Sequence, residues 1–399
     1  MGRQADWQAG GFGLYIHWPF CQAKCPYCDF NSHVTKTTPD HQGWAAALRS
    51  EMQAMRRLTG PRRLDTIFFG GGTPSLMAPA TVDALIAEAD RLWGLAPEPE
   101  ITLEANPTSV EAEQFRAFAA GGVNRVSVGV QALDDASLRA LGRLHSADEA
   151  RRALAIARET FKRVSFDLIY TRMGQTPEAW CQELDAALAM AADHLSLYQL
   201  TIEPGTRFAE LHARGRLSVP APEPSAAMYE ITQTLTAAAG LPAYEVSNHA
   251  VPGAESRHNL VYWRYGDYAG IGPGAHGRLT LQDGRRMATE SLADPAEWLT
   301  AARRAQPGGK DASGAHRFTE VLDREAQGDE MMLMGLRLAE GVEPARFERL
   351  TGRPLPAERI AALQTDGLLA LQDTPAGPRL AATARGRIVL NALLAELLA

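Results

Sequence analysis

The chain has 399 residues, of which 45% are hydrophobic and 22% are charged, and its formal net charge is −7 at pH 7. This balance is typical of a globular protein with one large and one smaller domain, and an acidic chain without a basic tract argues against a general nucleic-acid binder. No apolar stretch approaches the length of a membrane span, and residues 1–12 lack the apolar core of a signal peptide. We therefore expect a protein of the reducing cytoplasm.

The N-terminal part of the chain carries a cysteine cluster. Residues 1–12 are predicted to form a loose tail, and the aromatic and β-branched run 14–18 a strand. Clustered thiolates select zinc, copper or iron–sulfur centres, and a closed zinc site would need His33 or a neighbour as its fourth ligand. Three thiolates without a fourth favour a [4Fe–4S] cluster. Because such clusters usually take four Cys, three ligands leave one iron open. The loop at 20–33 holds three of the chain's four cysteines: Cys21, Cys25 and Cys28.

Strands and helices then alternate along the chain. Because repeated β–α units form parallel sheets buried on both faces, the sequence predicts an α/β fold, a partial (β/α)6 TIM-like barrel over 13–240. Five further strands are predicted over 65–70, 100–107, 125–131, 163–170 and 194–202. Helices are predicted between and after them over 40–60, 78–93, 109–120, 146–160, 177–192 and 222–240.

Polar residues recur where four of these strands end, namely Glu104, Gln131, Asp167 and Gln199. In a β/α barrel this is the end at which ligands bind, so we expect these side chains to face a site. The strand at 65–70 also runs into a glycine run at 70–72. Glycines let backbone N–H groups approach a ligand closely, although a tight turn without a ligand is an alternative.

The last third of the chain differs in texture. Segment 241–290 is dense in aromatic residues, Gly and His, and we expect it to line a ligand site. Residues 291–399 are predicted to form an α+β, winged-helix-like domain with helices over 326–340, 356–364 and 384–398 and a short hairpin between 367 and 383. From 317 to 399 there are 10 Lys and Arg against 12 Asp and Glu. This balance argues against DNA binding and favours a cover or partner-docking module.

The motifs together resemble a known superfamily. CxxxCxxC after the first strand, with Tyr27 before the third cysteine, resembles the radical S-adenosylmethionine (SAM) superfamily. The runs Phe-Gly-Gly-Gly-Thr-Pro-Ser, Glu-Ala-Asn-Pro and Ser-Val-Gly-Val-Gln resemble the coproporphyrinogen III dehydrogenase (HemN) group over nearly the whole chain. Phe30, at a position where the dehydrogenase has a further Cys, and the run His258-Asn-Leu-Val-Tyr-Trp263 resemble the haem chaperone branch (HemW) of that group.

The resemblance implies cofactors and the residues that contact them. Cys21, Cys25 and Cys28 would hold the [4Fe–4S] cluster, and SAM would chelate its open iron. Tyr15, Tyr27, Gly71, Gly72, Thr73 and Glu104 would lie at the cluster-bound SAM. Gln131, Arg143 and Asp167 match positions that contact a second SAM in the dehydrogenase, a space that haem could fill here. His258, Tyr262, Trp263 and His276 would serve haem.

Several alternatives stay open from the sequence. His258 and His276 compete as the axial haem ligand, and His258 could instead bond a loop while the neighbouring aromatic residues pack. The resemblance implies a haem chaperone that binds haem and transfers it to acceptor proteins, with an electron donor for the cluster. An oxygen-independent coproporphyrinogen III oxidase is the alternative. The sequence does not decide whether the protein cleaves SAM productively. It also leaves open whether the protein is a monomer or a homodimer and whether it contacts a membrane peripherally.

Overall fold

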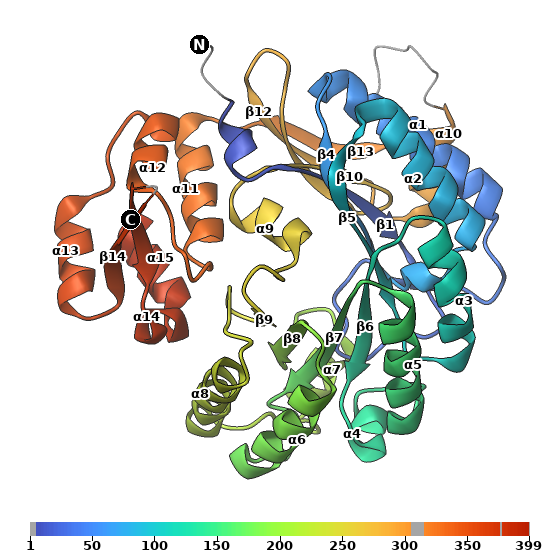
Figure 1. The fold of residues 1–399 in the computed structure, drawn as a ribbon, viewed down its shortest axis with the longest axis horizontal. Helices are drawn as coiled ribbons and strands as arrows, with labels where there is room; N and C mark the ends of the chain where they lie inside the picture. The colour runs from blue at the N-terminus through green and yellow to red at the C-terminus, as the bar shows by residue number, and fades with distance from the viewer. Residues whose placement is uncertain (1–4, 305–314, 376, 399) are drawn as a thin grey trace.

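A single large sheet organises the protein (Figure 1). The computed structural model describes residues 5–304, 315–375 and 377–398. Within these residues the sheet has 11 strands in the order β13-β12-β11-β10-β1-β4-β5-β6-β7-β8-β9. The six predicted strands are confirmed, and all pair in parallel in chain order. They are β1 (Phe12–Trp18), β4 (Leu64–Gly71), β5 (Leu95–Ala105), β6 (Arg125–Gln131), β7 (Arg163–Tyr170) and β8 (His194–Gln199).

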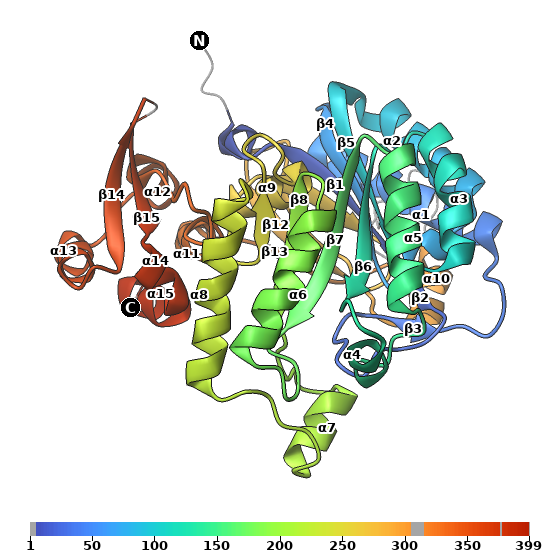
Figure 2. The same ribbon diagram turned by 60° about the horizontal axis from the view of Figure 1, so that its bottom comes forward.

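Helices cover the outer face of the curved sheet, as Figures 1 and 2 show. Side-chain caps fix where several of them begin: Asp40 accepts a hydrogen bond at the start of α1, and Ser146 forms a capping box with Glu149 at the start of α5. The helices of this part of the chain are α1 (His41–Thr59), α2 (Pro79–Trp93), α3 (Ser109–Ala120), α4 (Asp135–Ala140), α5 (Ala147–Thr160), α6 (Pro177–Met190), α7 (Arg207–Ala213) and α8 (Pro222–Ala238). Of these, α4 and α7 do not cover the sheet but lie beyond the ends of the strands (Figure 2).

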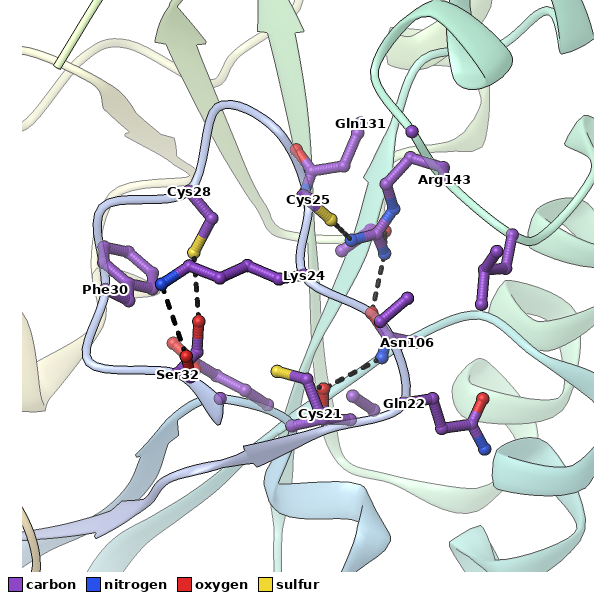
Figure 3. Close-up of a pocket in the computed structure, with 18 of the residues that line it drawn as sticks. Cys21, Gln22, Lys24, Cys25, Cys28, Phe30, Ser32, Asn106, Gln131 and Arg143 are labelled. Atoms are coloured by element: carbon purple, nitrogen blue, oxygen red, sulfur yellow. Dashed lines mark hydrogen bonds between the residues drawn. The ribbon is translucent and has the colours of Figure 1, made fainter. Parts of the chain in front are cut away.

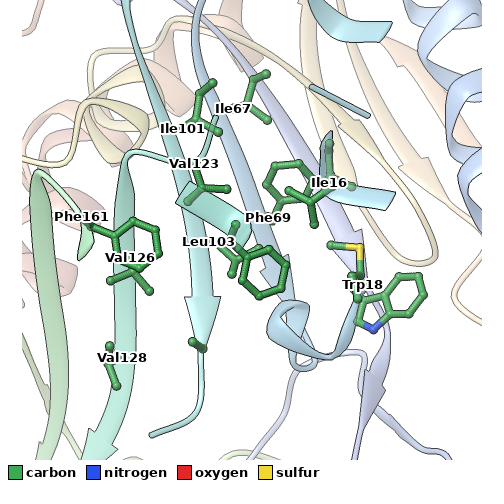
Figure 4. Close-up of a cluster of buried hydrophobic side chains, with 14 of the residues drawn as sticks. Ile16, Trp18, Ile67, Phe69, Ile101, Leu103, Val123, Val126, Val128 and Phe161 are labelled. Carbon is green, nitrogen blue, oxygen red and sulfur yellow. The ribbon is translucent and has the colours of Figure 1, made fainter. Parts of the chain in front are cut away.

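The main hydrophobic core lies between this sheet and its helices. Figure 4 shows Ile67, Ile101 and Val126 on neighbouring strands pointing into it, with Phe161 beside them. Strands covered on both faces read as nearly continuous apolar runs, and this explains why the sequence predicted them. The same packing brings the polar residues at the C-terminal ends of the strands to one side of the molecule.

The sheet extends beyond the six predicted strands on both sides. β9 (Asn248–Ala250) pairs with β8, and β10 (Asp267–Ile271) pairs in parallel with β1 on the side away from β4. The remaining elements of segment 241–290 are α9 (Arg257–Trp263), β11 (His276–Thr280) and β12 (Arg286–Ser291). The sequence predicted a ligand-lining surface here but not these strands, because each strand is short and the partner of β10 lies near the N-terminus.

The C-terminal residues form a second unit with its own core. Residues of α11, α12, α15 and the hairpin pack around Met332, Phe347 and Leu380, each less than 1% exposed. Helices followed by an antiparallel hairpin fit the winged-helix-like expectation. The elements are α11 (Arg324–Gly335), α12 (Pro344–Thr351), α13 (Ala357–Thr365), β14 (Leu369–Thr374), β15 (Gly377–Ala382), α14 (Ala384–Ile388) and α15 (Leu390–Leu398).

Two details differ from the predicted organisation of this region. α10 (Pro295–Arg304) packs on α1 and β13 (His316–Val321) extends the main sheet, so the second core begins near residue 324 and not at 291. The predicted helix over 384–398 is interrupted at Val389, which lies between α14 and α15. The change in sequence pattern near residue 291 therefore marks the edge of the main sheet and not the start of the second core.

The start of the chain is also more ordered than predicted. A 3₁₀ turn, η1 (Asp6–Ala9), places Trp7 edge-on against Phe12 and pairs Asp6 with Arg346 of α12. The predicted loose tail is therefore wrong for residues 5–12, and residues 1–4 lie outside the described part. None of the helices in the described ranges is both long and apolar enough to cross a bilayer.

Candidate cofactor site

The cysteine loop projects at the C-terminal end of β1. Its base is closed by a parallel pair, β2 (Phe20–Cys21) and β3 (His33–Val34), so the loop leaves and returns at one place. Cys21, Cys25 and Cys28 all line one pocket, as predicted from their spacing (Figure 3). His33, the candidate fourth ligand of a zinc site, instead lies within hydrogen-bonding distance of the Asn31 side chain and does not line this pocket.

Each of the three thiols faces a different polar side chain. Thr73 donates from its hydroxyl to Cys21, and the Arg143 guanidinium donates to Cys25. The Ser32 hydroxyl lies opposite the Cys28 sulfur. The distances from these groups to sulfur are 3.3 Å for Thr73, 3.4 Å for Arg143 and 3.7 Å for Ser32.

Arg143 also connects the two sides of the pocket. Its Nη2 donates to the Asn106 side-chain oxygen at 2.6 Å and to the Gly129 carbonyl at 2.9 Å (Figure 3). The Asn106 side-chain nitrogen donates in turn to the Thr73 hydroxyl at 3.2 Å. Sequence reasoning assigned Asn106 no role, although its place two residues after Glu104 at a strand end was an available signal.

The glycine run after β4 brings backbone close to the cysteine loop. A Cβ on Gly72 would lie 2.8 Å from the Phe20 carbonyl oxygen, and Gly71 has φ +111°, a conformation that L side chains rarely adopt. Gly71, Gly72 and Thr73 line the thiol pocket, and the short 3₁₀ turn η2 (Pro74–Leu76) follows. Only glycine fits this close approach, so the run does more than reverse the chain.

Three of the four polar strand ends meet at the same pocket. Glu104, Gln131 and Asp167 line it together with Tyr27. Gln131 has φ +72°, which is uncommon for a residue other than glycine and coincides with a register shift between β6 and β7. Gln199 does not join them, because it is exposed and donates to the Ser225 carbonyl.

Burial dominates the electrostatics of the pocket. It raises the pKa of Glu104 to about 8, with a further increase from the nearby Asp167 charge, while the Gly71 N–H donates to the Glu104 carboxylate at 3.3 Å. Burial also raises the pKa of the Asp167 carboxyl and of the Cys21 and Cys28 thiols. Ionised forms are therefore disfavoured here until a cation or a metal compensates them.

A wider cavity of about 620 Å³ adjoins the thiol pocket. Phe30, Gly71 and Glu104 line both, so the two spaces share a wall. Tyr15, predicted to lie at the cluster-bound SAM, lines the wider cavity and not the thiol pocket. The other ring-bearing residues that line it are His17, Tyr262, Trp263, Tyr268 and His276.

The two candidate haem histidines occupy different environments. His258 is 1% exposed, and its ring nitrogens lie 2.7 Å from the Thr66 hydroxyl and 2.7 Å from the Tyr262 hydroxyl. Burial lowers the pKa of His258 to about 3, so the ring is neutral. His276, at the start of β11, is exposed and lines the wider cavity. The geometry of His258 matches the alternative of a hydrogen-bonded histidine beside packed aromatic residues.

The residues of the thiol pocket fit a polynuclear cluster. Within the described residues, no three His, Cys, Asp or Glu side chains lie close enough to share a single metal ion. The thiols instead line a common pocket from one loop, each beside a polar group, and Arg143 Nε is buried there without a partner. This arrangement fits a cluster in which each thiolate binds a separate iron. The unpartnered Arg143 Nε is a hydrogen-bond donor that can bind an anionic group.

Comparisons with known proteins show the family of this chain. A model of the Radical SAM superfamily matches residues 15–187, and a model of the HemN C-terminal domain matches residues 322–389. The chain is 36% identical over 395 residues to Heme chaperone HemW of Escherichia coli (strain K12), a match that covers 97% of this chain and 98% of the relative. The chain belongs to the HemW family of radical SAM proteins. Membership of the radical SAM superfamily implies a [4Fe–4S] cluster and SAM as cofactors.

Other relatives place this HemW-family chain in a wider group. It is 38% identical over 395 residues to the mitochondrial Radical S-adenosyl methionine domain-containing protein 1 of Bos taurus, which covers 96% of this chain and 87% of the relative. The solved structure of coproporphyrinogen III oxidase (HemN) from Escherichia coli has a TM-score of 0.76 at 23% identity, covering 100% of this chain and 93% of that chain. HemW-family and HemN chains therefore share this fold.

Proposed function

We propose that the protein is a haem chaperone of the HemW type. It holds a [4Fe–4S] cluster and SAM in the thiol pocket, binds haem in the wider cavity and passes haem to acceptor proteins. The observation that carries this proposal is the ring-lined cavity of about 620 Å³ that shares Gly71 and Glu104 with the thiol pocket. Its size falls within the range of small-molecule sites, roughly 300–1,000 Å³.

The chemistry of the cavity suits a porphyrin. The rings of Tyr262, Trp263 and Tyr268 line the cavity and give it apolar aromatic surface. His276 provides an imidazole that can coordinate haem iron. His258, by contrast, orients the Tyr262 hydroxyl and is not proposed as a ligand, because its ring nitrogens face the Thr66 and Tyr262 hydroxyls.

In the thiol pocket the chain's residues bind and orient the cofactors. When bound, the cluster supplies one-electron chemistry at its open iron. The Glu104 carboxyl, with its raised pKa, becomes a carboxylate when it faces the ammonium group of SAM, and the Gly71 N–H supports that charge. Arg143, Gln131 and Asp167 line the rest of the pocket, and we propose that they contact SAM.

The cellular setting belongs to the same proposal. The four described cysteines are unpaired, and a reduced cluster needs an external electron donor, so we place the protein in a reducing cytoplasm. The C-terminal unit is proposed as the docking module for acceptor proteins.

The alternative function, oxygen-independent oxidation of coproporphyrinogen III, is tested directly by anaerobic incubation of the reduced, cluster-loaded protein with SAM and that substrate. Formation of protoporphyrinogen would replace the chaperone proposal.

Haem titration tests the proposed ligand. Adding haem to the full-length protein is expected to give a Soret band that saturates at one equivalent. His276→Ala should weaken haem binding by at least tenfold and shift the band, because the axial nitrogen is lost. His258→Gln, a matched change at the buried histidine, should keep the position of the band and change affinity less. A wild-type band in His276→Ala together with a lost band in His258→Gln would reverse the assignment.

A further inference from the structure

The three thiols are surrounded by donors that the family motif of cysteines does not include. Thr73 and Ser32 are 5% and 4% exposed, and their hydroxyls lie 3.3 Å from the Cys21 sulfur and 3.7 Å from the Cys28 sulfur. Arg143 lies 3.4 Å from the Cys25 sulfur. Every cluster ligand therefore has one side chain beside it that carries a proton.

The direction of these hydrogen bonds follows from the chemistry of the ligands. A thiolate bound to iron has no proton to donate, so the hydroxyls and the guanidinium are the donors in the loaded protein. A hydrogen bond to a cluster sulfur stabilises the reduced state more than the oxidised state, because the reduced cluster carries one more negative charge. The nearly buried position of Thr73 and Ser32 strengthens this effect, since the local dielectric constant is low.

Arg143 differs from the two hydroxyls because it brings a full positive charge. Charge-assisted hydrogen bonds are roughly twice as strong as neutral ones. Asn106 and the Gly129 carbonyl hold the guanidinium at 2.6 Å and 2.9 Å, so it cannot turn away from Cys25 without breaking both contacts. Asn106 also bonds the Thr73 hydroxyl, which couples the donors at Cys25 and Cys21.

We infer that Arg143, Thr73 and Ser32 are positioning residues that raise the reduction potential of the cluster, with Arg143 having the largest effect. The step concerned is one-electron reduction, [4Fe–4S]²⁺ + e⁻ → [4Fe–4S]⁺, with the electron taken from an external low-potential one-electron donor and no bond formed or broken. The inference rests on the cluster in the proposed function and is independent of haem. It assigns to Arg143 a role toward the cluster in addition to any contact with SAM.

Redox titration of the anaerobically loaded full-length protein tests this inference. Dithionite provides the electrons, and the signal of the reduced cluster is followed by electron paramagnetic resonance without SAM or haem. Arg143→Gln is expected to lower the ratio of reduced to oxidised cluster at a fixed applied potential by at least tenfold, which is ~59 mV for one electron. Thr73→Val and Ser32→Ala should shift the midpoint in the same direction by less. Thr73→Ser and Arg143→Lys, which keep a donor, should restore most of the shift.

Thr234→Val is the matched control. Thr234 lies on α8 outside the thiol pocket and its hydroxyl bonds the Glu230 carbonyl, so this variant should have the potential of the wild type. Full cluster content with a wild-type potential in Arg143→Gln and Thr73→Val would overturn the inference, as would an equal shift in Thr234→Val. If Arg143→Gln fails to hold a cluster, the pair Thr73→Val and Thr73→Ser decides. Wild-type protein without iron and acid-labile sulfide would instead overturn the proposed function.

Discussion

The carboxyl group of Glu104 is strongly affected by its surroundings. Its pKa rises from 4.5 to about 8 through burial and the neighbouring Asp167. The unfolded chain releases this proton near its ordinary pKa, whereas the folded protein retains it. Folding stability of the ligand-free protein therefore falls as pH rises above about 4.5, and the full penalty is present above pH 8. This cost is the price of a carboxyl prepared for a cationic ligand.

Glu104→Gln should remove that cost. In metal-free, SAM-free protein the variant is expected to gain stability over the wild type, and the gap should widen by about 3 kcal/mol from pH 5 to pH 7, since one pKa unit corresponds to ~1.4 kcal/mol. Urea unfolding at the two pH values measures it. Glu113→Gln, at an exposed glutamate of α3, should show no such widening. A constant gap for Glu104→Gln would mean that the carboxyl is already ionised at pH 5.

At this scale the sequence predicted the residues that a motif or a strand end makes visible. The cysteines, the glycine run, Glu104 and Asp167 all reach the same pocket. Asn106 was missed because its role depends on contacts with side chains from other elements. Ser32 was missed because its contact with Cys28 depends on how the cysteine loop folds. The axial role of His258 stays a prediction, and its ring partners, Thr66 and Tyr262, argue against it.

At the scale of the elements, the turn after α4 packs against the cysteine loop and restricts its position. Gly142 has φ +69°, and a Cβ there would lie 2.5 Å from the Pro26 ring. Pro26 sits between Cys25 and Tyr27, and its carbonyl accepts a hydrogen bond from the Phe208 N–H of α7. The loop is therefore held between two elements that lie far from it in the sequence, and a small change at the turn reaches the thiols.

Gly142→Ala should displace the loop. The variant is expected to retain the helical circular dichroism of the wild type while its iron and acid-labile sulfide content falls more than twofold, because the added methyl group overlaps Pro26. Gly174→Ala is the matched control, since Gly174 has φ +68° but nothing within 4 Å of an added Cβ. Both changes impose the same backbone strain. Equal cluster loss in the two variants would attribute the effect to strain and not to the loop.

The elements themselves were predictable where local pattern decided them. The six parallel strands carry long apolar runs, and their helices carry caps and helical spacing, so the sequence identified both. β10 to β13 were missed because short strands among glycines gain their identity from pairing, and β10 pairs with a strand at the other end of the chain. α12 was missed as well.

Across the whole molecule, arginine side chains join the C-terminal unit to η1 and to the turn between α9 and β10. Arg346 of α12, 7% exposed, bonds both Asp6 side-chain oxygens and the carbonyls of Arg264 and Tyr265. Glu340 accepts from Arg264 at 2.9 Å and from Arg379 at 3.1 Å. Because the buried bonds of Arg346 are costly to leave unmade, the unit is expected to stay docked in the native state.

Arg346→Ala should weaken this docking. We expect a loss of about 2 kcal/mol in the free energy of opening the C-terminal unit, because Asp6 and two carbonyls lose their partner. Native-state hydrogen exchange of the amides in α12 and β15 measures it. Arg349→Ala, on the same helix, removes an exposed ion pair with Glu343 and should cost less than ~0.5 kcal/mol. Similar exchange in both variants would show that the unit is docked by its apolar contacts alone.

The wall common to the two cavities has a thermodynamic consequence. A ligand that contacts the Glu104 carboxylate from one side alters the charge and hydration met by a ligand on the other side. Reciprocity then requires each to change the affinity of its neighbour by the same factor. The shared Glu104 side chain thus couples the binding of the two ligands energetically, with no movement of the backbone.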